Sequence, residues 1–336
     1  MAIRTIVVGA GGISGAWFPA LIAEGVEISS VVDTRFDAAQ ARIEEFSLPS
    51  RATTDLHSSI SQDKPDFVLD LTIPSAHCEV TCTSLEMGCH VLGEKPIASS
   101  MNEARKMVQT SLKTGKMYMI DQSRRWETPN LSAKEFIGSG TIGQVTTINC
   151  DFFLGAHFGG FRDEMESPLI LDMSIHHFDL ARYITGLDPV SVYAREFNPK
   201  GSWYKGDVSA NCIFEMEGGV YFCYRGSWCS EGFHTGWGGD WRIIGDNGTF
   251  LYEKDSILKA QKIKSRSGFN SEMYDVDVPE VIPPAPTMHG ALKEMLEYIE
   301  TGKRPQTECA DNIKSLAMVF AAIESSKTGE KVTITW

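Results

Sequence analysis

The chain has 336 residues, which is enough for about two domains that each bury a core of their own. Acidic residues outnumber basic ones by 44 to 31, and the net charge of -13 argues against a protein that binds nucleic acid through its phosphate backbone. No run of 18 apolar residues is present, so the sequence predicts no transmembrane helix and no association with a membrane.

The N-terminal part of the chain alternates short apolar runs with stretches that suit helices. The predicted strands are residues 5–8, 28–32, 67–72, a strand that begins at Val91 and Leu92 and is closed by Lys95-Pro96, and residues 117–120. The predicted helices are residues 14–24, 37–46, 75–88 and 101–115. Ser100 and Glu103 have the spacing of a capping box at the start of the last of these helices. Strands that alternate with helices form βαβ units, so the pattern predicts an α/β Rossmann domain with a doubly wound parallel sheet over residues 1–124.

After residue 125 the pattern changes to strands with few helices between them. The predicted strands are residues 146–153, 191–195, 210–215, 220–227 and 241–244, and Asp246-Asn247-Gly248 is a hairpin-type turn. Helices are expected over residues 168–185 and, as a pair, over residues 289–327. This pattern predicts an α+β domain over residues 125–336, with a mostly antiparallel sheet that carries helices on one face.

A glycine-rich run, Gly9-Ala10-Gly11-Gly12-Ile13-Ser14-Gly15, lies between the first predicted strand and the first predicted helix. This is the setting of the dinucleotide-binding fingerprint, whose glycines allow a tight turn and let a pyrophosphate approach the helix N-terminus. Ser14 stands where the fingerprint has its third glycine. The alternative interpretation is a glycine turn in an unrelated α/β protein.

Asp33 ends the second predicted strand, where an acidic side chain accepts hydrogen bonds from the ribose hydroxyls of NAD. Its carboxylate repels the 2′-phosphate of NADP. Arg35, two residues further on, offers a guanidinium group that binds such a phosphate. The sequence therefore favours NAD as the cofactor and leaves NADP open.

Glu94-Lys95-Pro96 closes another strand of the predicted parallel sheet. Ligands bind at the carboxyl ends of such strands, so we expect Lys95 to face the cofactor crevice. Its ammonium group can donate a hydrogen bond to a substrate hydroxyl and lower the cost of ionising that hydroxyl. The alternative interpretation is a solvated lysine on the surface.

The helix predicted over residues 168–185 carries Asp172, His176 and Asp179 at positions i, i+4 and i+7, which share one face of a regular α-helix. His177 lies on the apolar stripe instead, and we expect it to be buried in the core. Oxidation of an alcohol needs a base for the hydroxyl proton, and histidine suits this role near neutral pH. We therefore expect His176 to act as the base and Asp172 to orient it or to bind a neighbouring hydroxyl.

Other residues are candidates for substrate contacts. Arg124 and Arg125 follow the last strand of the first domain, and His157 with Gly159-Gly160-Phe161-Arg162-Asp163 forms a loop that we expect to be mobile. Each basic residue has a surface salt bridge as its alternative role. Trp228, Trp237 and Trp241 lie in a glycine-rich stretch, and they either stack on a sugar or fill a subunit interface.

Three of these segments together resemble the Gfo/Idh/MocA family of NAD(P)-dependent oxidoreductases, which includes glucose-fructose oxidoreductase and inositol dehydrogenase. They are Gly9 to Gly12, Thr72-Ile73-Pro74-Ser75-Ala76-His77, and His90-Val91-Leu92-Gly93-Glu94-Lys95-Pro96. The resemblance covers nearly the whole chain. It implies that the second domain has a large open-faced sheet that serves substrate binding and assembly into homodimers or homotetramers. It also implies hydride transfer between nicotinamide and a secondary alcohol of a sugar or polyol.

The resemblance assigns roles to residues at matching positions. Lys95, Asp172 and His176 correspond to the catalytic lysine and the D-x-x-x-H pair of the family. The segment from Thr72 to Pro74 and His77 is implied to lie beside the cofactor. With the glycine run, the expected cofactor contacts are Gly9, Gly11, Gly12, Ile13, Ser14, Asp33, Thr34, Arg35, Thr72, Ile73, Pro74, His77, Glu94 and Lys95. The expected substrate contacts are Lys95, Arg124, His157, Arg162, Asp172 and His176.

Two sets of residues suggest metal sites, and neither has convincing ligand spacing. A zinc site built from His77, Cys78, Cys82, Cys89 and His90 lacks a C-x2-C pair. A site built from His157, Asp172, His176 and His177 fails if His177 points into the core. We therefore expect no metal. The N-terminus does not resemble a signal peptide, so the eight cysteines are expected to be reduced thiols in the cytoplasm.

Three functions are compatible with these residues. The first is an NAD(P)-dependent dehydrogenase that acts on CH–OH groups of sugars or polyols. The second is a glycoside hydrolase or lyase that oxidises a sugar, eliminates, and returns the hydride, so that it yields no net NADH. The third is a non-catalytic NAD-sensing regulator, for which a broken catalytic set would be expected.

Overall fold

The computed structural model describes residues 2–336, which form two compact units. Unit 1 comprises Met1–Trp126 and Pro284–Ile313, and unit 2 comprises Glu127–Pro283 and Lys314–Trp336. The first boundary lies two residues from the division expected at 124/125, since it follows Trp126. The sequence-based division assigned residues 284–313 to the second domain, whereas here they belong to unit 1.

Unit 1 contains a six-stranded sheet in the order β3-β2-β1-β4-β5-β6, and all its strand pairs are parallel. The strands are β1 (Arg4–Val8), β2 (Glu27–Val32), β3 (Arg51–Thr53), β4 (Phe67–Asp70), β5 (His90–Glu94) and β6 (Tyr118–Asp121). The predicted doubly wound parallel sheet is confirmed. Because every strand runs the same way, the glycine run after β1, Asp33 after β2 and Lys95 after β5 all lie at the carboxyl edge of the sheet.

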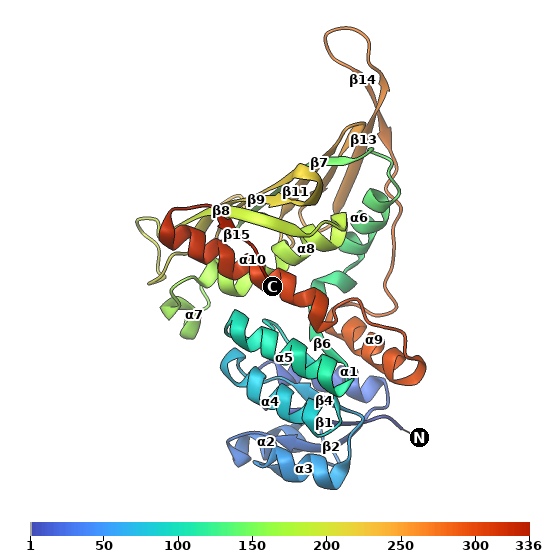
Figure 1. Cartoon of the computed structure of the whole chain (residues 1–336), viewed down its shortest axis with the longest axis vertical. Helices are drawn as coiled ribbons and strands as arrows, with labels where there is room; N and C mark the ends of the chain where they lie inside the picture. The colour runs from blue at the N-terminus through green and yellow to red at the C-terminus, as the bar shows by residue number, and fades with distance from the viewer. Residues whose placement is uncertain (1) are drawn as a thin grey trace. The chain divides into compact units, whose positions relative to one another are not determined.

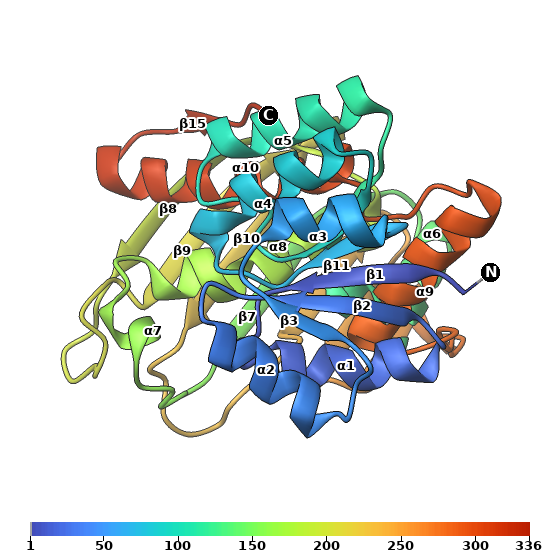
Figure 2. The same cartoon turned by 90° about the horizontal axis from the view of Figure 1, so that it is seen from below.

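Helices cover both faces of this sheet (Figure 2). They are α1 (Ser14–Ala23), α2 (Phe36–Glu45), α3 (Leu56–Asp63), α4 (Pro74–Glu86) and α5 (Met101–Thr114). Figure 2 shows α1 and α2 on one face and α3, α4 and α5 on the other. The predicted capping residue of α5 is in place, since Ser100 Oγ accepts a hydrogen bond from the backbone N–H of Glu103 over 3.2 Å.

The C-terminal segment of unit 1 completes its core. The short 3-10 helix η1 (Ser123–Trp126) packs against α9 (Thr287–Thr301). A side chain at Gly290 would meet the Trp126 ring, because its Cβ would lie 2.4 Å from Trp126 Cγ. Trp126 also donates a hydrogen bond from its indole nitrogen to Glu294 over 3.1 Å. Glycine at position 290 therefore lets α9 approach η1 closely, and the core of unit 1 includes residues from both ends of the chain.

Unit 2 contains a nine-stranded sheet in the order β14-β13-β12-β11-β7-β10-β9-β8-β15. Only β7 and β10 pair in parallel among the strands of residues 2–336 that form this sheet, so the prediction of a mostly antiparallel sheet is confirmed. The strands are β7 (Val145–Phe153), β8 (Pro189–Phe197), β9 (Ser209–Met216), β10 (Val220–Ser227), β11 (Asp240–Gly245), β12 (Gly248–Glu253), β13 (Ile257–Ser265), β14 (Glu272–Val276) and β15 (Val332–Thr333).

One face of this sheet carries the helices of unit 2 (Figure 1). They are α6 (Thr128–Gly138), α7 (Phe161–Glu164), the π-helical segment η2 (Leu169–Ser174), α8 (Ile175–Thr185) and the part of α10 (Cys309–Thr328) that begins at Lys314, whereas the short 3-10 helix η3 (Glu217–Gly219) forms the turn between β9 and β10. Phe178 of α8 is buried and packs edge-on against Phe214 of β9 and Tyr224 of β10, with ring centroids 4.8 and 5.3 Å away. Residues that alternate with these on the strands therefore lie on the opposite face.

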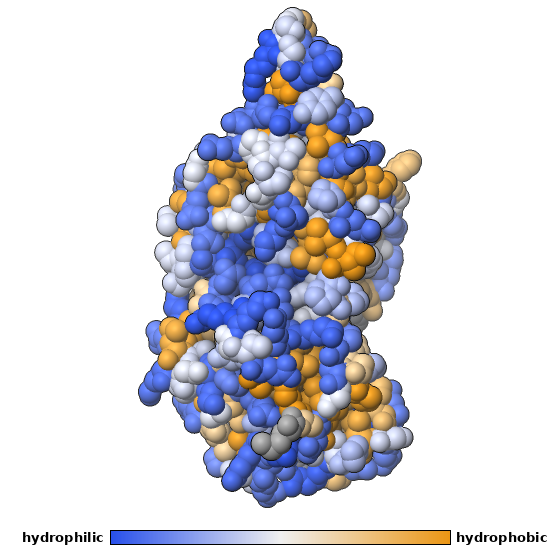
Figure 3. All heavy atoms as spheres, turned by 90° about the vertical axis from the view of Figure 1, so that its right-hand side faces the viewer, coloured by the Kyte–Doolittle hydropathy of each residue, from blue (hydrophilic) through white to orange (hydrophobic). Residues whose placement is uncertain are grey.

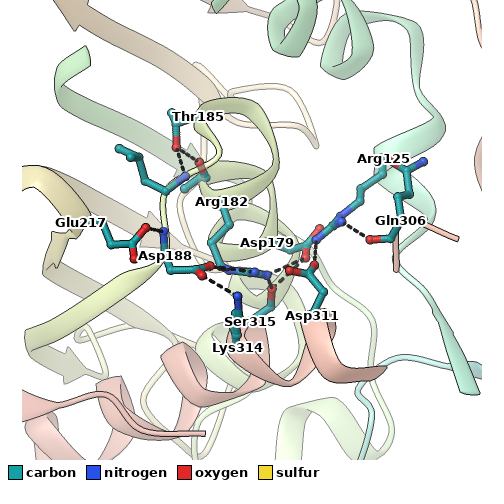
Figure 4. A network of polar contacts seen from close by, with 12 residues as sticks. Arg125, Asp179, Arg182, Thr185, Asp188, Glu217, Gln306, Asp311, Lys314 and Ser315 are labelled. Atoms are coloured by element: carbon teal, nitrogen blue, oxygen red, sulfur yellow. Dashed lines mark hydrogen bonds and ion pairs between the residues drawn. The ribbon is translucent and has the colours of Figure 1, made fainter. Parts of the chain in front are cut away.

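A buried polar network joins α8 to α10 within unit 2 (Figure 4). Arg182 donates to Asp188 over 3.0 Å and to Ser315 Oγ over 2.9 Å. Ser315 in turn donates to Asp179 over 2.7 Å. Because both Arg182 and Asp179 are almost fully buried, these bonds compensate the cost of taking their charges out of water.

The surface is mixed in character. On the face seen in Figure 3, hydrophobic residues form separate patches between hydrophilic ones. No helix within residues 2–336 combines the length and the apolar character that crossing a membrane requires.

Candidate active site

The glycine run forms a tight turn with open space beside it. Gly9 has a φ of +100°, and a Cβ at this position would lie 2.6 Å from the carbonyl oxygen of Leu71. Only glycine fits there. Gly11 and Gly12 are exposed, and a Cβ at either position would meet no atom within 4 Å. The turn therefore leaves room for a ligand to approach the backbone at the start of α1, where unpaired N–H groups favour an anion.

Ser14 replaces the third glycine of the fingerprint without disturbing the turn. Its side chain is buried, and its Oγ donates a hydrogen bond to the carbonyl oxygen of Gly11 over 2.7 Å. Arg42 of α2 donates to the same carbonyl oxygen over 3.0 Å. Arg42 also lies beside Gly15, where a Cβ would come within 3.2 Å of its guanidinium. These contacts brace the loop from its protein side, and the sequence analysis did not identify Arg42.

Asp33 lies beside the glycine turn. One carboxylate oxygen accepts a hydrogen bond from the backbone N–H of Ala10 over 2.8 Å, and the other accepts one from the backbone N–H of Arg35 over 2.9 Å. Asp33 is half-buried, while Thr34 and Arg35 are exposed. The two bonds fix the carboxylate at the end of β2 and next to the loop, as a ribose-binding residue requires.

Glu94 and Lys95 close β5 and are tied to α1. The indole nitrogen of Trp17 donates to Glu94 Oε1 over 2.9 Å, and the backbone N–H of Lys95 donates to Glu94 Oε2 over 3.2 Å. Burial raises the pKa of the Glu94 carboxyl, whereas the bond from Trp17 lowers it. Lys95 is half-buried. The strand that precedes Lys95 is thus linked to the helix that the glycine run opens.

Asp121 is a further acidic residue at this edge of the sheet. It ends β6 and stands opposite Glu94 in the register of the two strands. Asp121 is 2% exposed, and burial raises its pKa well above the usual range, with the nearby charge of Glu94 acting in the same direction. The positive charge of Lys95 acts in the opposite direction. Lys95 is therefore close to the carboxyl groups of Glu94 and Asp121, and both of these groups have raised pKa values.

His77 holds two turns of this edge together. Its Nδ1 lies 2.9 Å from the carbonyl oxygen of Pro96, and its Nε2 lies 3.0 Å from that of Thr72. The ring is buried, whereas Ile73 and Pro74 are exposed. Thr72 is held in turn by Asp70, which accepts a hydrogen bond from its Oγ1 over 2.6 Å. His77 therefore supports the turns on which Thr72, Ile73, Pro74 and Lys95 stand, and it offers no exposed ring nitrogen to a ligand.

Arg124 and Arg125 lie side by side in η1 and differ in their surroundings. Arg125 is buried and donates to the carbonyl oxygen of Gln306 over 2.8 Å and to Asp311 over 3.1 Å (Figure 4). Its role is therefore structural. Arg124 is half-buried, and of the two it is the one that remains a candidate for a substrate contact.

In unit 2, Asp172 is held by Arg162. The Arg162 Nε atom donates to Asp172 Oδ2 over 2.6 Å, and the two side chains are 32% and 15% exposed. Asp172 lies in the π-helical segment η2, while His176 lies in the first turn of α8. A π-helical turn holds more residues than an α-helical turn, and such turns are frequent at functional sites. The structure thus brings together two residues that the sequence analysis had named separately.

The expectation that Asp172, His176 and Asp179 share one face of a regular α-helix is wrong for Asp172, whereas His176 and Asp179 both lie in α8 at positions i and i+3. The π-helical segment interrupts the α-helical spacing before His176. Asp179 is 2% exposed and takes part in the network with Ser315 and Arg182. His176 is 9% exposed, whereas His177 is fully buried against Phe152, as expected for a core histidine.

His157 has different contacts from those that join Arg162 to Asp172. Its ring stacks on Trp203 with centroids 3.7 Å apart, and its Nε2 lies 2.9 Å from Glu231. Of the three tryptophans considered for stacking, Trp228 and Trp241 are 2% exposed, whereas Trp237 is 43% exposed. Only Trp237 of these three therefore presents a ring to a ligand or to a partner.

Neither proposed metal site is assembled. Within residues 2–336, no group of three or more His, Cys, Asp and Glu side chains is placed so that it could hold a metal ion. His90 Nδ1 accepts a hydrogen bond from the backbone N–H of Met117 over 2.9 Å, and burial lowers its pKa to about 4. All eight cysteines are free thiols.

Comparisons with known proteins agree with these two units. The model of an oxidoreductase family with an NAD-binding Rossmann fold, GFO_IDH_MocA, matches residues 3–122. The model of the GFO/IDH/MocA C-terminal domain matches residues 130–251. The two models are consecutive in the chain, and each falls within one of the units described above.

The sequences of individual relatives share less than a third of their residues with this chain. A D-glucoside 3-dehydrogenase of Escherichia coli (strain K12) is 31% identical over 209 residues, which are 60% of this chain and 59% of that protein. A 1,5-anhydro-D-fructose reductase of Ensifer adhaerens is 23% identical over 98% of this chain and 97% of that protein. An oxidoreductase from Agrobacterium radiobacter, solved with NAD+, L-tartaric acid and magnesium, has a TM-score of 0.85 at 22% identity and covers 99% of this chain and 98% of its own. The last similarity concerns the fold.

Proposed function

The chain belongs to the GFO/IDH/MocA family of oxidoreductases with an NAD-binding Rossmann fold, and from this we propose that it transfers a hydride between nicotinamide and a secondary alcohol of a sugar or polyol. The observation that carries the proposal is the hydrogen bond from Trp17 to Glu94. It links the helix opened by the glycine turn to the strand that precedes Lys95. A cofactor cradle and a candidate proton donor are thereby held at one edge of one sheet.

The residues of unit 1 fit a dinucleotide. Gly11 and Gly12 leave the space that a pyrophosphate needs, and the start of α1 supplies N–H groups. Asp33 is fixed where a carboxylate can accept from ribose hydroxyls. NAD, when bound, supplies the hydride acceptor for alcohol oxidation. We assign NAD as the preferred cofactor, because the Asp33 carboxylate disfavours a 2′-phosphate. NADP is the lesser one, since the exposed guanidinium of Arg35 is available to bind that phosphate.

Lys95 is assigned the role of donating a hydrogen bond to the substrate hydroxyl. Lys95 lies next to two carboxyl groups, because its backbone N–H donates to Glu94 and Asp121 stands opposite Glu94 in the register of β5 and β6. A positive charge beside the reacting oxygen stabilises the alkoxide character that develops as the hydride leaves carbon. Glu94 and Asp121 are then positioning residues that act through Lys95.

His176 and Asp172 are assigned to transfer of the hydroxyl proton and to orientation of the groups that take part in it. His176 accepts the hydroxyl proton in the oxidative direction, and Asp172 binds a neighbouring hydroxyl or orients the ring. Arg162 holds the Asp172 carboxylate in one orientation through the bond of 2.6 Å. Arg124, His157 and Arg162 are the further residues that we assign to substrate binding.

We further propose that the protein assembles into homodimers or homotetramers through the nine-stranded sheet and works in the cytoplasm, where its eight thiols stay reduced. The sheet face opposite α8 exposes Tyr193, Ile213 and Tyr221 by 49, 48 and 51%, and Tyr193 stands opposite Ile213 in the register. Apolar side chains grouped in this way favour association. Sedimentation of an Ile213→Asp variant tests this, and an unchanged sedimentation coefficient would exclude this face.

The function is tested by screening sugars, polyols and sugar acids for reduction of NAD and NADP at alkaline pH. We expect net NADH from at least one of them, and loss of that signal in Lys95→Ala although NAD still binds. A substrate that is consumed without net NADH would favour a hydrolase or lyase that returns the hydride. NAD binding with no turnover of any compound would favour a regulator.

A further inference from the structure

Three exposed aromatic side chains of unit 2 are linked by contacts with Phe158 and Arg162. Phe158, Phe161 and Trp237 are 43, 66 and 43% exposed. The Phe158 ring lies 6.2 Å from that of Trp237 and 5.1 Å from that of the buried Trp228. Aromatic rings are more stable when they are removed from water, so a group of large rings that stays exposed marks a binding surface.

Arg162 connects these rings to Asp172, whose carboxylate we propose to contact the substrate. Its guanidinium carbon lies 4.9 Å from the centroid of Phe158 and 4.7 Å from that of Phe161. The same side chain donates to Asp172. A ligand that reaches Asp172 therefore comes next to Arg162 and the two phenyl rings, so the aromatic group is continuous with the proposed substrate site.

The backbone on both sides of this group is fixed by hydrogen bonds. The N–H of Ala156 donates to the carbonyl oxygen of Trp228 over 3.2 Å, and the N–H of Ser230 donates to that of Leu154 over 3.1 Å. On the other side, the N–H of Trp237 donates to Asp255 over 2.8 Å. These bonds fix the backbone at Ala156 and at Trp237, and the Phe158 ring packs against the Trp228 ring. Fewer groups then have to be ordered when a ligand binds.

The angle between the two rings shows what they can accommodate. The planes of Phe158 and Trp237 are inclined by 58°. One pyranose ring lies flat on one aromatic ring through its apolar C–H groups, so it cannot stack on two rings that are inclined in this way. The pair therefore suits a substrate with two apolar surfaces. His157 and Glu231, which lie 2.9 Å apart and are exposed, add polar groups in the same part of the unit.

We infer that Phe158 and Trp237 form a stacking subsite for the group attached to the oxidised sugar, so that the preferred substrates are glycosides with a cyclic aglycone or a second sugar ring rather than free monosaccharides. The inference rests on the proposed function, because it concerns the substrate class of the same site. Arg162 is the residue that connects the two parts of the site.

The test compares two probes that differ only in the ring of the aglycone, phenyl β-D-glucoside and methyl β-D-glucoside. Calorimetric titration of the full-length protein in the presence of NAD gives the affinity for each, and initial rates of NADH formation give kcat and KM. We expect the wild type to prefer the phenyl compound, and we expect Trp237→Ala and Phe158→Ala each to lose about three- to tenfold in affinity for it. Affinity for the methyl compound and kcat should change little.

Phe233 supplies a matched control. It is fully exposed, lies in the same segment as Trp237, and takes part in none of the ring contacts formed by residues 2–336. Phe233→Ala should behave as the wild type. The inference is overturned if the wild type binds both probes equally well, if Phe233→Ala causes the same loss, or if Trp237→Ala dissociates an oligomer in sedimentation, which would make the group a subunit contact. If neither probe yields NADH, calorimetry still decides the subsite, and the screen of sugars, polyols and sugar acids decides the proposed reaction.

Discussion

The indole nitrogen of Trp17 and the carboxylate of Glu94 form a hydrogen bond of 2.9 Å. Trp17 is fully buried on α1, and Glu94 is the last residue of β5. Two segments that are far apart in the sequence, the helix after the glycine turn and the strand before Lys95, are thus fixed by one donor and one acceptor.

Replacing Trp17 by Phe keeps an aromatic ring in the core and removes the N–H donor. We expect the free energy of unfolding to fall by about 1–3 kcal/mol, the cost of leaving a buried carboxyl group without its partner. Urea unfolding measures this loss. In the double variant with Glu94→Leu the loss should not be additive, because leucine has no oxygen to accept from Trp17 and both substitutions therefore remove the same bond; additive losses would show that the bond contributes little.

Lys95→Ala should lower turnover by about a hundredfold or more while NAD affinity stays nearly unchanged. The reason is that the ammonium group acts on the substrate oxygen, whereas the cradle is formed by the glycine turn and Asp33. Steady-state rates and calorimetric NAD titration measure the two quantities separately. Comparable turnover in the variant would remove Lys95 from the reaction.

Asp33→Ser should reduce the preference for NAD over NADP by about tenfold or more, the scale of one charge–charge interaction near a protein surface. Serine can still accept the hydrogen bond that Ala10 donates, so the loop should keep its form. Arg35 is then able to bind a 2′-phosphate. The ratio of kcat/KM for the two cofactors is the measurement, and a wild type that already prefers NADP strongly would contradict the role given to Asp33.

His176→Asn should abolish the pH dependence assigned to a general base. In the wild type, the oxidation rate rises with pH as His176 loses its proton, because only the neutral ring can accept one. The variant should be slower by about 10² to 10⁴ and show no such rise. His177→Asn is unsuitable as a comparison, since that ring is buried in the core. A pH–rate profile that survives the substitution would assign the base elsewhere.

Glu196 should make stability fall as pH rises through the range from about 4.5 to 7. It is 4% exposed on β8, and burial raises its pKa from 4.5 to about 7, with Asp207 acting in the same direction and Lys327 and the bond from Ser167 in the opposite one. The folded protein therefore binds a proton that the unfolded chain releases, and at pH 8 ionisation costs about 3 kcal/mol relative to pH 4.

Unfolding by urea at pH 5 and pH 8 tests this. Glu196→Gln should lose this part of the pH dependence and be the more stable protein at pH 8. The exposed neighbour Glu166 provides the control, and Glu166→Gln should keep the wild-type behaviour. If Glu196→Gln keeps it as well, the slope comes from another group.

The strands of unit 1 could be predicted where a buried apolar run stops at glycine, proline or aspartate, as in β1, β2 and β5. The three residues of β3 (Arg51–Thr53) carry no such signal, because a short polar edge strand is defined by its pairing with β2. That residues 284–313 belong to unit 1 could not be predicted, for a similar reason. The packing of Gly290 against Trp126 depends on a contact between distant parts of the chain, which no local pattern records.

In the candidate site, too, residues with a local sequence signal could be predicted, whereas residues defined by contacts between distant segments could not. Gly9 and Asp33 are recognisable because turn geometry and strand position determine their roles. Trp17, Arg42 and Asp121 were not identified, since their importance comes from tertiary partners: Glu94, the Gly11 carbonyl oxygen, and the register between β5 and β6. The helix-face argument for Asp172 assumed an uninterrupted α-helix, and an amino-acid pattern does not reveal an extra residue in one turn.

The discontinuity of unit 1 has a consequence for biosynthesis. A ribosome that has released residues 1–126 has exposed every strand of the parallel sheet, but the sheet still lacks α9 and its buried residues Ala291, Leu292 and Met295. Domains generally fold as units while they are synthesised, starting from the N-terminus. Here the segment of unit 2 between residues 127 and 283 must be translated before unit 1 can close its core. The nascent cofactor-binding unit therefore remains incomplete while residues 127–283 are synthesised, and chaperones can bind it during this interval.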